Sequence, residues 1–131
     1  RLQARGAAGL VVHGAVRDVW QMRDIDIPVY TLHVHASAIQ RAVMAVEMDG
    51  IITCNGVAVR PGDWVVGDPD GVVVVPASLA VEASQYGADH EDLETYLRER
   101  VLAGAPLAEA YPPNEAVRAA YQARYPGRTT H

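Results

Sequence analysis

The sequence predicts an α/β fold, and three observations lead to this. A short apolar, β-branched run at residues 9–13 precedes a segment of helical composition at residues 15–22. Residues 46–76 alternate apolar runs with strong turn signals, which is typical of closely spaced strands. Apolar residues at helical spacing then follow within residues 77–131. We therefore expect a sheet-rich part over residues 1–76 and a helical part over residues 77–131.

The composition limits the classes of partner. Of the 131 residues, 50% are hydrophobic and 21% are charged, which is ordinary for a globular domain. The net charge of −5 argues against a nucleic-acid or membrane surface. No run reaches the roughly 20 apolar residues of a membrane span. A single cysteine, Cys54, excludes an internal disulfide and fits a reducing compartment, so we expect a cytoplasmic protein.

The first elements form a strand-turn-helix unit. Residues 1–5 look like the end of a helix stopped by Gly6. Residues 9–13 are expected to form a strand that is buried on both faces and ends at Gly14, before the helix at residues 15–22. Because the chain opens with Arg1 inside this pattern, we expect the N-terminal part of the domain to be missing from it.

A second strand and a compact set of further strands follow. Val29–Leu32 is the second strand, and residues 36–45 suit either a helix or an irregular connection. Three turns then separate four apolar runs: Asn55-Gly56, Pro61-Gly62 and Asp68-Pro69-Asp70-Gly71. The runs predict a β-meander with strands at 51–54, 57–60, 64–66 and 72–75.

The remaining segments are expected to be helical. We predict helices at 77–84 and 91–102, the second opened by acidic residues next to His90 and carrying one apolar stripe of Leu93, Tyr96, Leu97 and Val101. Residues 106–113 are expected to be a loop. Asn114 then caps a last helix in which Val117 and Tyr121 share a face.

The strongest candidate for chemistry is the Arg17–Asp18 pair. It lies after a predicted strand and at the start of a helix, where α/β proteins often bind ligands and backbone N–H groups attract anions. A guanidinium grips a carboxylate through two parallel hydrogen bonds, and a carboxylate suits Mg²⁺ or Mn²⁺. The alternative is that both are solvated residues of a helix's first turn.

Five segments together resemble one protein family; they are residues 9–19, 27–30, 56–63, 67–76 and 110–115. The resemblance is to the RraA-like family, shared by the regulator of ribonuclease activity A and the 4-hydroxy-4-methyl-2-oxoglutarate / 4-carboxy-4-hydroxy-2-oxoadipate aldolases. It implies a swivelling β/β/α three-layer sandwich that assembles as trimers or hexamers. Residues 1–76 would form the C-terminal part of the sandwich, and residues 77–131 helices that pack on it or on a neighbouring subunit.

The aldolase branch of the family implies a reaction and two site residues. Arg17 would bind the pyruvate unit of a 4-hydroxy-2-oxo diacid, and Asp18 would anchor Mg²⁺ or Mn²⁺. The metal would stabilise a pyruvate enolate during retro-aldol cleavage, and oxaloacetate decarboxylation is the expected side activity. The alternative, implied by the regulator branch, is a non-catalytic protein that binds and inhibits a ribonuclease.

Two departures from the aldolase pattern stand out. The aldolase pattern pairs the Arg-Asp motif with an acidic residue about twenty positions before the Arg. In this sequence that residue would precede Arg1, so a companion chain is one possible source of it. The residue before Gly14 is commonly Asp in that family and is His13 here. We expect His13 to pack, with a change in the protonation chemistry of the pocket as the alternative.

Other residues have simpler explanations. His33 and His35 alternate, so a strand would turn both to one face, where they could ligate a metal; this is a weak signal without a third ligand. Cys54, Met44 and Met48 are expected to pack in the core. The turn aspartates Asp63, Asp68 and Asp70 are explained by their turns without an ion.

Overall fold

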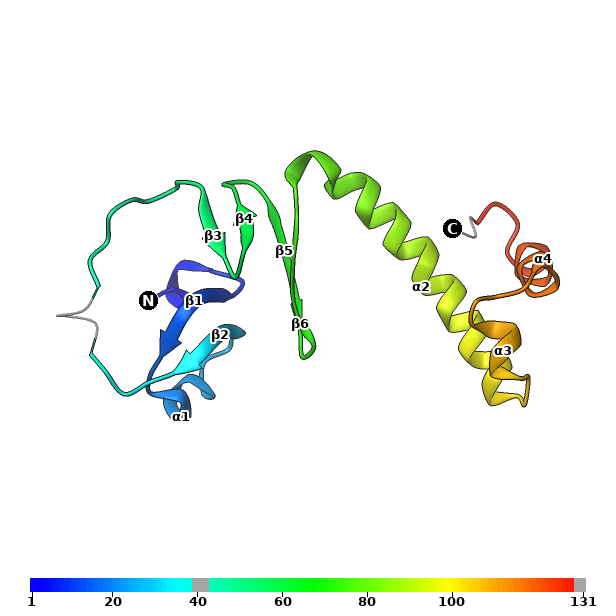
Figure 1. Cartoon of the computed structure of the whole chain (residues 1–131), viewed down its shortest axis with the longest axis horizontal. Helices are drawn as coiled ribbons and strands as arrows, with labels where there is room; N and C mark the ends of the chain where they lie inside the picture. The colour runs from blue at the N-terminus through cyan, green and yellow to red at the C-terminus, as the bar shows by residue number, and fades with distance from the viewer. Residues whose placement is uncertain (39–42, 129–131) are drawn as a thin grey trace. The chain divides into compact units, whose positions relative to one another are not determined.

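The computed structural model describes residues 1–38 and 43–128 and divides into two compact units, Arg1–Ala77 and Ser78–His131 (Figure 1). All the strands of the described residues lie in the first unit, and the long helices lie in the second. The predicted α/β class is confirmed. How the second unit packs, on the sheets or on another subunit, stays a prediction.

Two parallel strands form the start of the first unit. After a 3-10 turn at Gln3–Arg5, which Gly6 ends in a left-handed conformation as predicted, β1 runs over Leu10–Val16. It pairs with β2, Val29–Val34, and the register shifts between Val12 and Ala15. The helix α1 between them spans only Val19–Met22.

The prediction that the strand ends at Gly14 and a helix begins at Ala15 is wrong. Pairing with β2 resumes at Ala15 and continues to Val16, so the ladder holds residues whose composition suits a helix. The hydroxyl of Thr31 also donates to the Gly14 carbonyl oxygen at 3.0 Å. Pairing with a distant strand therefore prevails over local helix propensity at this point.

Two antiparallel hairpins complete the first unit. Strands β3 (Ile52–Cys54) and β4 (Val57–Val59) pair across the Asn55-Gly56 turn, whose φ angles of 49° and 84° match the predicted type I′ turn. Strands β5 (Trp64–Asp68) and β6 (Gly71–Val75) pair across the aspartate turn, where Asp68 Oδ1 accepts from the backbone N–H groups of Asp70 and Gly71.

The predicted continuous meander is wrong, because β4 and β5 are not paired in the described residues. The side chain of Asp63 holds the segment that connects β4 to β5 through two hydrogen bonds. Its Oδ2 accepts from the Arg60 N–H at 2.8 Å and its Oδ1 accepts from the Ala77 N–H at 3.1 Å. The Arg60 amide is thus bonded within the turn and not to a neighbouring strand.

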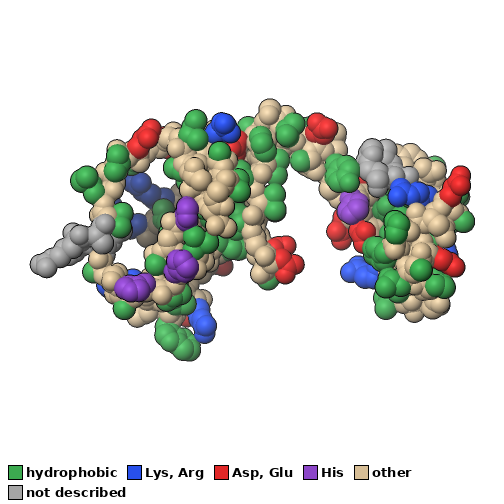
Figure 2. Space-filling view, in the orientation of Figure 1, with side chains coloured by type: hydrophobic (Ala, Val, Ile, Leu, Met, Phe, Trp, Pro, Cys, Tyr) green, Lys and Arg blue, Asp and Glu red, His purple; other side chains and the backbone are tan. Residues whose placement is uncertain are grey.

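The first unit has no fully buried residue in its described part, since every buried residue lies in the second. Strand β1, expected to be buried on both faces, instead alternates between half-buried and exposed positions. Met44 and Met48, expected in the core, are 79% and 86% exposed. No second layer from the described residues of the first unit itself covers these faces, and Figure 2 shows hydrophobic side chains at their surface.

The second unit is built on a long helix, α2, over Ala80–Leu102, preceded by a 3-10 turn at Ala77–Leu79. The predicted break before residue 91 does not exist. Tyr86 stacks on His90 with ring centroids 5.9 Å apart, and His90 lies 3.7 Å from Glu94, so contacts one turn apart span the expected gap. His90 is therefore inside a helix.

Two shorter helices pack against α2 and form the core. They are α3 (Leu107–Ala110), where a loop was expected, and α4 (Glu115–Arg124). Asn114 caps α4 as predicted, because its side chain accepts from the Val117 N–H at 2.9 Å. The buried residues include most of the predicted stripe and both predicted α4 positions: Leu93, Tyr96, Leu97, Ala110, Val117 and Tyr121. No helix of the described chain could cross a membrane.

We expect Leu97→Ala to lower the free energy of unfolding of the helical unit by about 2 to 5 kcal/mol, since it leaves a cavity at a side chain that is 1% exposed. The control Leu102→Ala, at 81% exposure, should change it by less than about 0.5 kcal/mol. Urea denaturation followed by helical circular dichroism measures both. Equal effects of the two substitutions would contradict this core.

Candidate functional site

Arg17 and Asp18 connect the end of β1 to the start of α1. Asp18 has a left-handed backbone (φ 61°, ψ 38°), and its side chain makes no capping hydrogen bond to α1. Aspartate tolerates this conformation better than most residues. Because α1 has only four residues, its N-terminus contributes little to anion binding. The predicted binding of an anion at this connection therefore depends on the Arg17 side chain.

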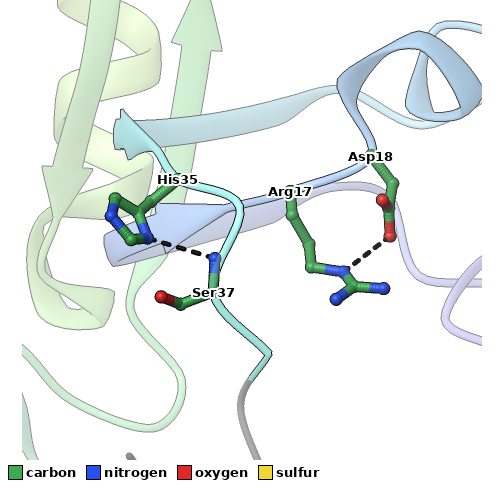
Figure 3. Close-up of polar contacts among 4 residues, drawn as sticks. All are labelled: Arg17, Asp18, His35 and Ser37. Carbon is green, nitrogen blue, oxygen red and sulfur yellow. Dashed lines mark hydrogen bonds and ion pairs between the residues drawn. The ribbon is translucent and has the colours of Figure 1, made fainter.

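The two side chains turn toward each other. Arg17 Nε lies 2.9 Å from Asp18 Oδ2, and the side chains are 52% and 56% exposed (Figure 3). An exposed ion pair of this kind stabilises the fold by no more than about 1 kcal/mol. The bond uses Nε, so the terminal nitrogens Nη1 and Nη2 keep hydrogen-bond donors that a carboxylate ligand can accept from.

Both residues line one pocket of about 900 Å³ within the first unit. Its wall combines polar groups with an apolar surface from β1 and α1. The lining residues are Val12, His13, Gly14, Ala15, Val16, Arg17, Asp18, Met22, His35, Ser37, Ala38 and Val43. This volume and this mixture of groups suit a small polar ligand.

His13 is exposed and does not pack as expected. Its Nδ1 lies 3.1 Å from the Thr53 carbonyl oxygen and 3.3 Å from the Asn55 backbone nitrogen. These contacts join β1 to the β3–β4 hairpin. His13 therefore attaches the hairpin to the strand and also lines the pocket.

The two histidines that were predicted to share a face, His33 and His35, lie in different surroundings. His35 lines the pocket and its backbone N–H donates to the Val16 carbonyl oxygen at 2.9 Å, whereas His33 is not among the lining residues. No group of three or more His, Cys, Asp or Glu residues that could hold a metal occurs in the described parts of the chain. Sequence spacing alone missed Ser37, because no motif marks a lone serine after a strand.

The donor set fits a hydrated divalent cation. Among the described residues that line the pocket, Asp18 is the one carboxylate, and its side chain is 56% exposed. Mg²⁺ is commonly held by one or two carboxylates and keeps several water ligands. A cation at Asp18 would therefore be bound largely through water.

These features define an α/β protein with a polar pocket at the carboxyl ends of two parallel strands. Residues 1–74 match the RraA-like family, described as Aldolase/RraA. The chain belongs to the RraA-like family.

The chain is similar to a protein of Halalkalibacterium halodurans named "Putative 4-hydroxy-4-methyl-2-oxoglutarate aldolase", with 33% identity over 75% of this chain and 48% of that protein. A solved structure from Streptomyces coelicolor, RraAS2, described as an unusual member of the RNase ES inhibitor RraA protein family, is 36% identical. Its TM-score is 0.70, over 76% of this chain and 50% of that one.

An uncharacterized protein of Pseudomonas syringae pv. tomato has a TM-score of 0.79 and 25% identity, over 84% of this chain and 55% of that one. The chain thus spans about half the length of the relatives that it matches.

We expect Arg17→Ala and Asp18→Asn each to change the free energy of unfolding by less than about 1 kcal/mol, because the pair is exposed and Asn keeps the left-handed backbone. Denaturant titration followed by tryptophan fluorescence measures this, since both tryptophans lie in the first unit. A loss of several kcal/mol would show that the pair is a structural element.

Proposed function

We propose that this chain carries the residues that bind the substrate and the metal in a divalent-metal-dependent lyase. The lyase cleaves a 4-hydroxy-2-oxo diacid to release pyruvate. The observation that carries the proposal is the convergence of Arg17 and Asp18 on one open pocket. The names of its aldolase relatives support the same reaction class.

Arg17 has the chemistry to hold the 2-oxo acid end of the substrate. Its guanidinium is permanently charged, and its two terminal nitrogens can bond both oxygens of a carboxylate. The contact with Asp18 fixes Nε and so limits the rotation of the guanidinium. A substrate that meets a guanidinium already oriented loses less conformational entropy on binding.

Asp18 is the proposed ligand of Mg²⁺ or Mn²⁺. When bound, the cation would supply a Lewis acid beside the 2-oxo group. In the reaction the C4 hydroxyl loses a proton and C4 becomes the carbonyl carbon of the second product as the C3–C4 bond breaks. The electron pair of that bond moves into the 2-oxo unit, and a proton added at C3 gives pyruvate. Oxaloacetate decarboxylation releases the same three-carbon unit and is the proposed side activity.

The remaining expectations about assembly are part of this proposal. We propose a homotrimer or hexamer in which an acidic residue absent from this chain, from preceding sequence or a companion chain, completes the site. The uncovered strand faces of the first unit support such a partner, since exposed apolar sheet surface is usually covered by protein. The cytoplasmic location stays a prediction.

The assembled protein, in which this chain is joined by the preceding sequence or companion chain that supplies the acidic residue, should release pyruvate when it is given Mg²⁺ or Mn²⁺ and either oxaloacetate or 4-hydroxy-4-methyl-2-oxoglutarate. A coupled dehydrogenase assay measures the pyruvate. Arg17→Ala and Asp18→Asn should each lower kcat/KM by about a hundredfold or more, because each removes a charged contact to the transition state. Chelation of the metal should have the same effect.

Matched controls come from the same helix region. Arg23 is the C-cap of α1 and lies over the Trp20 ring at 4.6 Å, and Asp24 follows it. Arg23→Ala and Asp24→Asn should leave the rate nearly unchanged, since neither residue lines the pocket. Absence of pyruvate release, or equal losses in the control variants, would rule out the proposed site.

The alternative function is inhibition of a ribonuclease without catalysis, and the Streptomyces coelicolor structure favours it through its family description. In that case the protein should bind an RNase E-type endoribonuclease and slow RNA cleavage. Affinity capture with the purified ribonuclease tests this. Arg17→Ala should leave capture unchanged if the pocket is not part of the binding surface.

A further inference from the structure

His13 joins β1 to the β3–β4 hairpin through a single ring nitrogen. Its Nδ1 lies 3.1 Å from the Thr53 carbonyl oxygen and 3.3 Å from the Asn55 backbone nitrogen, whose N–H is directed at it. Strands β1 and β3 are in contact here (Figure 1). Both contacts of the ring therefore form where the hairpin meets the strand.

The two hairpin groups are available to His13 because the hairpin does not use them. Cys54 and Val57 flank the two-residue turn, so they form the hydrogen-bonded pair next to it. The next pair, Thr53 and Ala58, is of the other kind, in which the carbonyl groups point away from the partner strand. The Asn55 N–H lies inside the turn, which closes through the residues that flank it.

One nitrogen cannot serve both groups in the same protonation state. A carbonyl oxygen only accepts and a backbone N–H only donates, so the Thr53 bond needs a proton on Nδ1 and the Asn55 bond needs its absence. In either state the remaining neighbour faces Nδ1 with a like group, as two acceptors or as two hydrogens. The contact thus has two alternative forms, and the proton on Nδ1 decides between them.

The surroundings of the ring allow this proton to come and go. Histidine is the side chain that changes charge between about pH 8 and pH 5, and His13 is exposed to solvent. A charged donor makes a stronger hydrogen bond than a neutral one, so the Thr53 carbonyl oxygen favours the protonated ring. No side chain of the described residues is hydrogen-bonded or ion-paired to the ring. The ionisable side chains on or next to β1, β2 and β3 are Arg17, Asp18, Tyr30, His33, His35 and Cys54.

We propose that His13 is a pH-sensitive switch in the attachment of the β3–β4 hairpin to β1. The neutral ring carries its proton on Nε2 and accepts from the Asn55 N–H at Nδ1. The protonated ring donates from Nδ1 to the Thr53 carbonyl oxygen and releases the Asn55 N–H. The inference does not depend on the proposed lyase function, because it rests on the contacts of His13 alone.

The switch would act on two cavities of the first unit. His13 lines the pocket that contains Arg17 and Asp18, and Asn55 lines a second cavity of about 560 Å³. When His13 changes its partner, the turn of the hairpin moves relative to β1. Acidification would therefore alter the walls of both cavities together.

Nuclear magnetic resonance of the protein labelled with ¹⁵N-histidine and ¹⁵N-asparagine tests the switch. At about pH 8 a scalar coupling should connect the Asn55 amide nitrogen to His13 Nδ1 across the hydrogen bond, and the ring should show the Nε2–H form. At about pH 5 the coupling should disappear, and the Asn55 amide proton should move upfield because it has lost its acceptor. The midpoint of this shift should equal that of the His13 ring signals.

The chain supplies a control within the same spectrum. Asn114 is its only other asparagine, and the Asn114 backbone N–H donates at 3.1 Å to the Glu109 carbonyl oxygen, which does not titrate. The Asn114 signal should not follow His13. His13→Gln should abolish the pH response of Asn55, whereas His33→Gln should preserve it, since the His33 side chain makes no hydrogen bond to the hairpin in the described structure.

Three results would each overturn the switch. They are a neutral His13 ring with its proton on Nδ1, an Asn55 signal that does not change with pH, and a pH response that survives in His13→Gln. The wild-type spectra alone decide the first two, so the test does not depend on the folding of a variant.

Discussion

The parallel pairing of β1 with β2 is the interaction on which the site depends. Parallel strands bring their carboxyl ends to the same edge of a sheet, where ligands commonly bind in α/β proteins. Val16 lies opposite Val34, and the next amide, from His35, bonds back to the Val16 carbonyl oxygen. Residues almost twenty positions apart in the chain thus reach one pocket because two short strands share a register.

Much of the fold could be predicted because it follows from local chemistry. Asn55-Gly56 forms its turn because both residues tolerate positive φ, and Asn114 starts α4 because its side chain accepts a backbone N–H that would otherwise lack a partner. The apolar spacing of Leu93, Tyr96 and Leu97 likewise identified the face of α2 that is buried. Each of these signals lies within a few residues.

The wrong predictions concern contacts between distant segments. Residues 14–16 have a composition that suits a helix, but the ladder with β2 holds them in a strand. The Asp63 carboxylate binds Ala77, fourteen residues away, and nothing in the local sequence of the hairpins indicates this. Met44 and Met48 were placed in a core on hydrophobicity alone, which cannot show whether a second layer covers them.

The residues of the candidate site show the same contrast between local signals in the sequence and contacts between distant segments. Arg17 and Asp18 could be named from sequence as a candidate pair, because two adjacent residues with complementary chemistry follow a predicted strand and match the Arg-Asp motif of the aldolase branch. His35 was noted for its alternation with His33, a pattern that suggested a shared metal. Only the structure shows that the two histidines differ, since one lines the pocket and accepts a backbone hydrogen bond and the other does not.

The left-handed backbone of Asp18 has a consequence for how this family can change over time. Few side chains tolerate that conformation, chiefly Gly, Asn and Asp itself, so the sequence has a narrow choice at this position. A lineage that no longer needs the negative charge can lose it through Asn or Gly without disturbing the connection to α1. The turn would then persist in proteins that keep the architecture but lack the carboxylate that we propose as a metal ligand.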